Sequence, residues 1–144
     1  MARSLVAVGA ALFIAMGAVH GLFTLRDVFD PKAFTPTDGS VRQAMQGAKL
    51  AFNRRANVWL AWLGFNLSHS LGLLVFGGVA LMLGWRHFGV FADSLVVQAL
   101  TILVAACYFV LSVRFWFWGP ALGSGTALLC FLLSAFLCWA RAAA

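Results

Sequence analysis

Four long apolar stretches constrain this sequence more than any other feature. A helix needs roughly 20 mostly apolar residues to cross a bilayer, and each stretch is about that long or longer. The sequence therefore predicts an all-α membrane protein, with the whole chain forming a single membrane domain of residues 1–144. The predicted spans cover residues 4–25, 58–85, 95–117 and 121–139.

Composition excludes the soluble classes of protein. Hydrophobic residues make up 63% of the chain and charged residues 10%, whereas soluble domains have about 45–50% and 25%. So few charges cannot cover the surface of a soluble domain. We therefore exclude an ordinary cytosolic enzyme, a disordered tail and a free nucleic-acid-binding protein. Despite the net charge of +6, we expect membrane lipids and no nucleic acid as partners.

The spacing of the spans predicts an up-down four-helix transmembrane bundle, because short connections place consecutive helices antiparallel. The single long connection, residues 26–57, is expected to lie outside the membrane. Ser40 and Gln43 within it have the spacing of a capping box, and apolar residues follow at helical intervals as far as Phe52. These residues predict a short amphipathic connector helix, which either lies on the membrane surface as a simple connection or acts as a lid or a partner-docking helix. The six tryptophans, Trp62 among them, lie near the predicted span ends and are expected to be interfacial anchors.

The distribution of basic residues predicts the orientation in the membrane. Seven lysines and arginines fall on the connector side and three on the other side, and the positive-inside rule then favours a cytoplasmic connector with both termini outside. We expect the membrane to be the bacterial inner membrane. The residues on the connector side are Arg26, Lys32, Arg42, Lys49, Arg54, Arg55 and Arg114, and those on the other side are Arg3, Arg86 and Arg141.

Polar side chains inside the spans are the best functional candidates, because such groups are costly in lipid. Asn66 and His69 are three residues apart and share a helix face, and the first span carries His20. Close approach of the two helices through small residues, such as Gly21, Gly64 and Ser68, would bring these groups together. The predicted ligand-binding pocket is lined by His20, Asn66, Ser68, His69, Arg114 and Arg55. The alternative is that they act only as interhelical hydrogen-bond donors and acceptors.

The two histidines also raise the question of a cofactor, since imidazole binds both haem and metal ions. His20 is predicted about 8 Å and His69 about 16 Å inside their helix ends, which disfavours a haem held by both. No metal-binding motif is present, so no metal is predicted. Haem stays open as an alternative, and no catalytic residue is assigned.

A short motif in the second predicted span carries a family resemblance. The chain reads Thr-Pro-Thr-Asp at residues 35–38 and Phe-Asn-Leu-Ser-His-Ser-Leu-Gly at residues 65–72. It resembles a family of small, uncharacterised bacterial four-span membrane proteins with a Thr-Pro-x-Asp stretch and a Phe-Asn-x-Ser-His-x-x-Gly motif. The resemblance implies the four-span architecture and draws attention to Asn66, Ser68 and His69. It implies no activity.

These observations lead to one leading function and two alternatives. The leading hypothesis is a membrane protein that binds a lipid-like or hydrophobic small molecule in the polar pocket, as an accessory subunit of a membrane-protein partner or as a homo-oligomer. The first alternative is a membrane enzyme, of an isomerase or a haem or quinone redox type, in which His20 or His69 transfers protons. The second is a purely structural subunit of a membrane complex.

Overall fold

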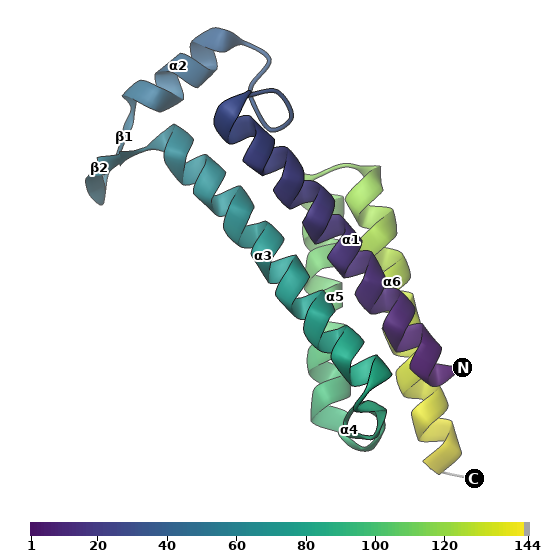
Figure 1. Cartoon of the computed structure of the whole chain (residues 1–144). Helices are drawn as coiled ribbons and strands as arrows, with labels where there is room; N and C mark the ends of the chain where they lie inside the picture. Colours follow the sequence, from purple (N-terminus) through teal and green to yellow (C-terminus); the bar gives the residue numbers. More distant parts are fainter. Residues whose placement is uncertain (143–144) are drawn as a thin grey trace. The chain divides into compact units, whose positions relative to one another are not determined.

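The fold is all-helical apart from one short hairpin, and the predicted fold class is confirmed. The computed structural model describes residues 1–142. The elements, labelled in Figure 1, are α1 (Ala2–Phe29), α2 (Gly39–Gly47), β1 (Lys49–Leu50), β2 (Asn53–Asn57), α3 (Val58–Trp85), α4 (Phe88–Asp93), α5 (Leu95–Phe115) and α6 (Trp118–Ala142).

Four of these helices, α1, α3, α5 and α6, are long and apolar enough to cross a membrane. They match the four predicted spans, with ends that differ by a few residues. The largest difference is at α1, which the sequence analysis ended at Leu25 and which continues to Phe29. At 1.5 Å per residue, its 28 residues extend about 42 Å, longer than the hydrocarbon core of about 30 Å. The last turn of α1, with Arg26 and Asp27, therefore reaches into the polar interface.

The chain divides into two compact units. The first comprises Met1–Met16 together with the chain from Leu73 onward, and it contains parts of all four long helices. Its core is a cluster of aromatic rings around Phe13 of α1. The Phe13 ring lies 4.7 Å from Phe76 of α3, 5.5 Å from Tyr108 of α5 and 6.3 Å from Phe131 of α6, measured between ring centroids. Each long helix thus contributes one ring to the same core.

Glycines allow close contact between α1 and α3 in this first unit. A Cβ atom added at Gly77 would lie 2.7 Å from Ile14 Cγ1, and one at Gly84 would lie 3.0 Å from Val6 Cγ1. Later residues of α3 therefore meet earlier residues of α1, so the two helices run antiparallel. A small residue at such a contact lets two helix backbones approach closely, which is how helices commonly pack in lipid.

The contacts of α6 complete the up-down arrangement. A Cβ added at Gly123 would meet Met16 Sδ at 2.6 Å. Towards the other end of α6, the buried Ser134 hydroxyl donates to the carbonyl oxygen of Ala2 at 2.9 Å. These contacts also run in opposite directions along the two helices. The predicted antiparallel bundle is confirmed within the first unit.

The short helix α4, between α3 and α5, was not predicted from the sequence. The side-chain amide of Gln98 on α5 donates to the carbonyl oxygens of Phe91 and Ala92, both at 3.0 Å. These carbonyls lie at the end of α4, where the helix itself provides no partners. The buried Gln98 side chain therefore satisfies the end of α4 and fixes it against α5.

The second unit is Gly17–Gly72, which holds the connector between the end of α1 and the start of α3. The predicted connector helix is shorter than expected and begins two residues earlier. Its N-cap is Asp38 rather than Ser40, and the Asp38 carboxylate accepts a hydrogen bond from the Ser40 backbone N–H at 2.8 Å. The helix ends at Gly47, where Ala48 takes an extended backbone conformation and its backbone N–H donates to the Ala44 carbonyl oxygen at 2.8 Å.

After α2 the chain forms an antiparallel two-stranded hairpin instead of continuing as a helix to Phe52. Leu50 pairs with Asn53 and Lys49 with Asn57, with an irregularity between the two pairs. The Asn57 side chain then accepts a hydrogen bond from Leu60 N at 2.8 Å, which caps the start of α3. The apolar residues up to Phe52 recur at intervals typical of a helix. In the structure, however, residues 49–50 form a strand that pairs with the polar strand β2.

Candidate intramembrane histidine site

Two helices of the second unit bring three polar side chains together. His20 lies on α1, and Asn66 and His69 lie on α3. His20 Nε2 is 3.0 Å from Asn66 Oδ1, and the rings of His20 and His69 meet edge to face with centroids 5.2 Å apart. Asn66 is fully buried, whereas both histidines are half-buried. We call these three residues the histidine site.

The depth of the two histidines differs less than the sequence analysis suggested. Because α1 continues to Phe29, His20 lies nine residues before its end, and His69 lies eleven residues after Val58, the start of α3. The predicted offset rested on ending α1 at Leu25. The longer helix places the two rings at matching depth and in direct contact.

The hydrogen bonds of Asn66 define which His20 nitrogen carries a proton. The Asn66 Nδ2 group donates to the Trp62 carbonyl oxygen at 2.8 Å. The amide nitrogen is therefore directed to the helix backbone, and the amide oxygen faces His20. An amide oxygen only accepts hydrogen bonds, so His20 Nε2 is the donor. In the neutral ring the lone pair then resides on Nδ1.

The site has an aromatic cover from the connector. The Phe34 ring lies against His20 with centroids 4.4 Å apart. The indole N–H of Trp62 donates to the Phe34 carbonyl oxygen at 2.9 Å, so α3 holds the residue that covers the imidazole. On the other side, the Phe65 ring stacks near His69 at 6.3 Å. An aromatic ring therefore lies against each of the two imidazoles.

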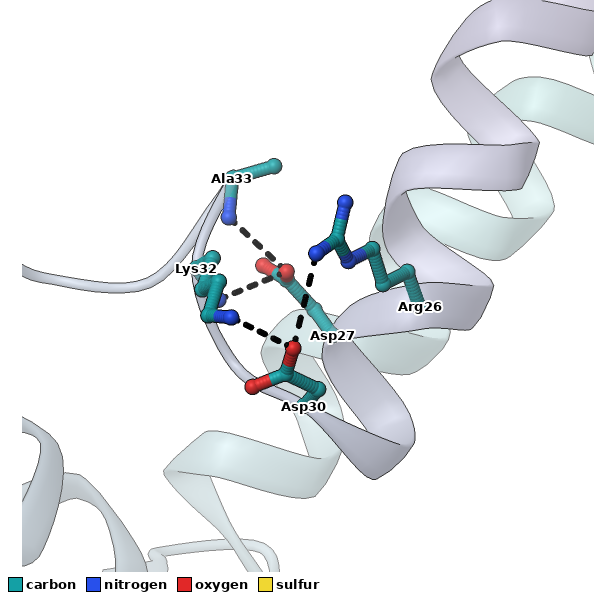
Figure 2. Close-up of polar contacts among 5 residues, drawn as sticks. All are labelled: Arg26, Asp27, Asp30, Lys32 and Ala33. Atoms are coloured by element: carbon teal, nitrogen blue, oxygen red, sulfur yellow. Dashed lines mark hydrogen bonds and ion pairs between the residues drawn. The ribbon is translucent and has the colours of Figure 1, made fainter.

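A buried carboxylate fixes the backbone that carries Phe34. Asp27, in the last turn of α1, accepts hydrogen bonds from the backbone N–H groups of Lys32 and Ala33, both at 2.8 Å, and of Phe34 at 2.6 Å. The Thr35 hydroxyl donates to the same carboxylate at 3.2 Å. Figure 2 shows the bonds from Lys32 and Ala33 converging on Asp27. The chain beyond α1 is thereby folded back around one side chain.

The neighbouring Asp30 makes a different and more exposed set of contacts. Its carboxylate lies 2.7 Å from Lys32 Nζ and 3.5 Å from Arg26 Nη2, as drawn in Figure 2. The hydrogen bond from Lys32 and the charge of Arg26 lower the pKa of Asp30. Exposed ion pairs of this kind contribute little to stability. Asp27 and Asp30 thus have separate roles, although they are three residues apart.

The helices approach through Gly21, as predicted, and Ser70, and not through the predicted Gly64 and Ser68. A Cβ added at Gly21 would lie 3.3 Å from Ser70 Cβ, and the buried Ser70 hydroxyl donates to the Asn66 carbonyl oxygen at 2.9 Å. Nothing lies within 4 Å of a Cβ added at Gly64, and Ser68 is exposed. The prediction for Gly64 and Ser68 was wrong, because the face of α3 that carries Asn66 and Ser70 turns toward α1.

Within the second unit, the predicted site residues Ser68 and Arg55 lie outside this cluster. The Ser68 hydroxyl donates to the Phe65 carbonyl oxygen of its own helix at 2.8 Å. Arg55 is exposed on β2. Arg114 lies in the last turn of α5, which belongs to the first unit. Three of the six predicted residues, His20, Asn66 and His69, are therefore in mutual contact within one unit.

The residues of the site do not suit a haem held by both histidines. The edge-to-face contact leaves no gap between the two rings for a flat macrocycle, and Nε2 of His20 is already bonded to Asn66. Within residues 1–142, no group of three or more histidine, cysteine, aspartate or glutamate side chains is placed to hold a metal ion. The chemistry available at the site is hydrogen bonding and proton exchange by imidazole, next to aromatic surfaces.

Sequence reasoning missed Asp27, Phe34 and the hydrogen bond of Trp62. Trp62 was interpreted only as an interfacial anchor, and Asp27 was assigned no role. The partners of Asp27 are mainly backbone N–H groups, which leave no side-chain pattern in a sequence. The one available signal is Pro31, which cannot continue a helix and therefore marks a sharp change of direction just after Asp27.

The four apolar helices make the chain a small multi-pass membrane protein. The chain matches no protein-family model, no curated protein and no solved structure. The resemblance seen in residues 65–72 therefore stays a prediction. What can be said of function rests on the geometry of the histidine site itself.

Proposed function

We propose that this small multi-pass membrane protein binds a lipid-like or other hydrophobic molecule whose polar end hydrogen-bonds to the histidine site. The observation that carries the proposal is the contact between His20 and His69, 5.2 Å apart, with Asn66 bonded to the first ring. Two imidazoles and an amide are a costly set of groups for an apolar helix pair. If these residues served only to join the two helices, the hydrogen bond between His20 and Asn66 would be enough, and His69 would not be needed.

The surroundings of the site favour a ligand that enters from the bilayer. Asn66 is buried, and its amide nitrogen and oxygen are both hydrogen-bonded, so it acts as a positioning residue for His20. Both histidines are half-buried, so part of each ring is accessible. Phe34 and Phe65 flank them with apolar ring faces. A hydrophobic body beside the aromatic rings and a hydroxyl, carbonyl or similar end at the imidazoles would match this arrangement.

The cellular setting is part of the same proposal. The excess of lysine and arginine in residues 26–57 supports a cytoplasmic connector with both termini outside, in a bacterial inner membrane. The motif of residues 65–72, which contains Asn66 and His69, supports membership of the four-span family that the chain resembles. The protein would act as an accessory subunit or as a homo-oligomer. A topology reporter fused after residue 144 tests the orientation, and activity of a cytoplasm-specific reporter there would contradict it.

The test is extraction of the purified protein, followed by mass spectrometry of the extracted small molecules. We expect a hydrophobic molecule to be retained by the wild-type protein and reduced by about tenfold or more in His69→Ala, as expected from the loss of a hydrogen bond worth about 1.5 kcal/mol. Ser68→Ala is the matched control, because Ser68 is adjacent, exposed and bonded only to its own helix.

Two outcomes would contradict the proposal. One is equal retention by wild type, His69→Ala and Ser68→Ala, which would show that any molecule present binds elsewhere. The other is the absence of any retained molecule in wild-type protein that is extracted directly in native lipid particles. Circular dichroism of each variant establishes that the helices are intact, so that loss of the ligand is not loss of the fold.

A further inference from the structure

The second half of the connector, residues 39–57, carries a concentration of positive charge without acidic residues. Residues 39–57 contain four basic side chains and no aspartate or glutamate. None of the four forms an ion pair with a carboxylate in residues 1–142, where the ion pairs involve Asp30 with Arg26 and Lys32. Three of the four, on the hairpin, are exposed. The basic residues are Arg42, Lys49, Arg54 and Arg55.

The same segment exposes apolar side chains. Phe52 lies in the turn between β1 and β2 and is 88% exposed. Val41 on α2 is 46% exposed, and α2 has no buried residue. An aromatic ring at a hairpin tip and an amphipathic helix without a packed face are costly in water. Both occur within the same nineteen-residue segment, residues 39–57, as the four cations.

The hairpin is joined directly to a membrane span. Strand β2 ends at Asn57 and α3 begins at Val58, with no linker between them. The Asn57 side chain caps the helix through Leu60 N, and the Val58 backbone N–H donates to the Ala48 carbonyl oxygen at 3.0 Å, which ties the hairpin base to the helix start. Figure 1 shows α2 and the hairpin leading into α3. The basic residues are therefore held at the start of a helix that is long and apolar enough to span a membrane.

We propose that α2 and the β1–β2 hairpin form a docking surface for anionic phospholipid head groups, with Phe52 inserted among the acyl chains. The cations Lys49, Arg54 and Arg55 flank the inserted ring and bind lipid phosphates. Charge complementarity selects this occupant, because a juxtamembrane cluster of cations next to an exposed aromatic residue matches a negatively charged leaflet. Arginine also binds phosphate through two parallel hydrogen bonds.

The surface is distinct from the histidine site, and it does not depend on the proposed function. The hairpin binds the head-group layer, whereas His20 and His69 lie within α1 and α3. Loss of the proposed small-molecule ligand in His69→Ala would leave lipid selectivity at the connector unchanged. The two proposals can therefore fail separately.

The test uses the full-length protein in nanodiscs of phosphatidylcholine alone and of an equal mixture with phosphatidylglycerol. Native mass spectrometry measures the preference for phosphatidylglycerol, and hydrogen exchange measures protection of residues 39–57. We expect phosphatidylglycerol to protect the connector in the wild-type protein. The preference should fall about fivefold for each cation removed in Arg54→Gln/Arg55→Gln, and Phe52→Ser should lose protection at the turn.

The matched control is Arg86→Gln/Arg141→Gln, which removes the same charge outside the connector and should keep the connector's lipid dependence. Raised salt should weaken the effect, because screening shortens the Debye length from about 10 Å at 0.1 M to about 3 Å at 1 M. Equal connector protection in both nanodisc types would overturn the proposal. So would an equal loss of lipid preference in the two double variants, since that would reflect net charge rather than this surface.

Discussion

His20 and Asn66 are joined by a 3.0 Å hydrogen bond between Nε2 and Oδ1, although they are 46 positions apart in the sequence. Asn66 in turn donates to the Trp62 carbonyl oxygen of its own helix. The Asn66 amide is held by the backbone of α3, and it orients the imidazole of His20 on α1. In a membrane, where water does not compete for these groups, such an arrangement fixes both the ring and its proton.

The first prediction concerns the tautomer of His20. Because the amide oxygen of Asn66 accepts the hydrogen bond, the neutral ring should carry its proton on Nε2. Nitrogen-15 NMR of histidine-labelled protein distinguishes the two tautomers, and the chain has three histidines to assign. Asn66→Leu should shift the His20 signals and lower the stability by about 1–3 kcal/mol, because the ring N–H loses its partner. A wild-type ring protonated on Nδ1 would contradict the assigned geometry.

The sequence was sufficient for the fold because membrane spans are specified by length and apolarity. The sequence also predicted that His20, Asn66 and His69 come together, because helical spacing places Asn66 and His69 on one face. It was not sufficient for the hairpin, because apolar residues recur at helical spacing as far as Phe52, yet Lys49 and Leu50 pair with β2. It was not sufficient for Asp27 either, since its partners are backbone N–H groups that any sequence provides.

A second prediction separates Asp27 from Asp30. Asp27→Asn replaces one of the two carboxylate oxygens by an NH2 group, which cannot accept hydrogen bonds. The backbone N–H groups of residues 32–34 therefore lose an acceptor and the negative charge that they face. We expect a loss of about 2 kcal/mol, with faster hydrogen exchange in residues 32–35. Asp30→Asn is the control, because its ion pairs are exposed and should matter little. Equal exchange in the two variants would show that the carboxylate of Asp27 does not hold this turn.

The cap of α2 should respond to acid. Hydrogen bonds from the hydroxyl and backbone N–H of Ser40 lower the pKa of Asp38. A carboxyl group with a lowered pKa in the folded state stabilises above its unfolded pKa of about 4, and this stabilisation is lost as the pH falls through the folded pKa. The amide proton shift of Ser40 should therefore titrate below pH 4. Asp38→Asn should keep the cap and abolish the titration; a persistent titration would contradict the assignment.

Two adjacent glycines provide the sharpest test of helix packing. A Cβ at Gly77 would lie 2.7 Å from Ile14 Cγ1 and 2.9 Å from the Ala10 carbonyl oxygen, whereas a Cβ at Gly78 would meet nothing within 4 Å. Because a backbone atom cannot move aside as a side chain can, Gly77→Ala must separate α1 from α3 at a cost of about 1–3 kcal/mol. Gly78→Ala should be neutral or stabilise the helix by up to about 1 kcal/mol. Thermal unfolding in the same detergent compares the two variants directly, and equal melting temperatures would show that α1 and α3 are not in contact at Gly77.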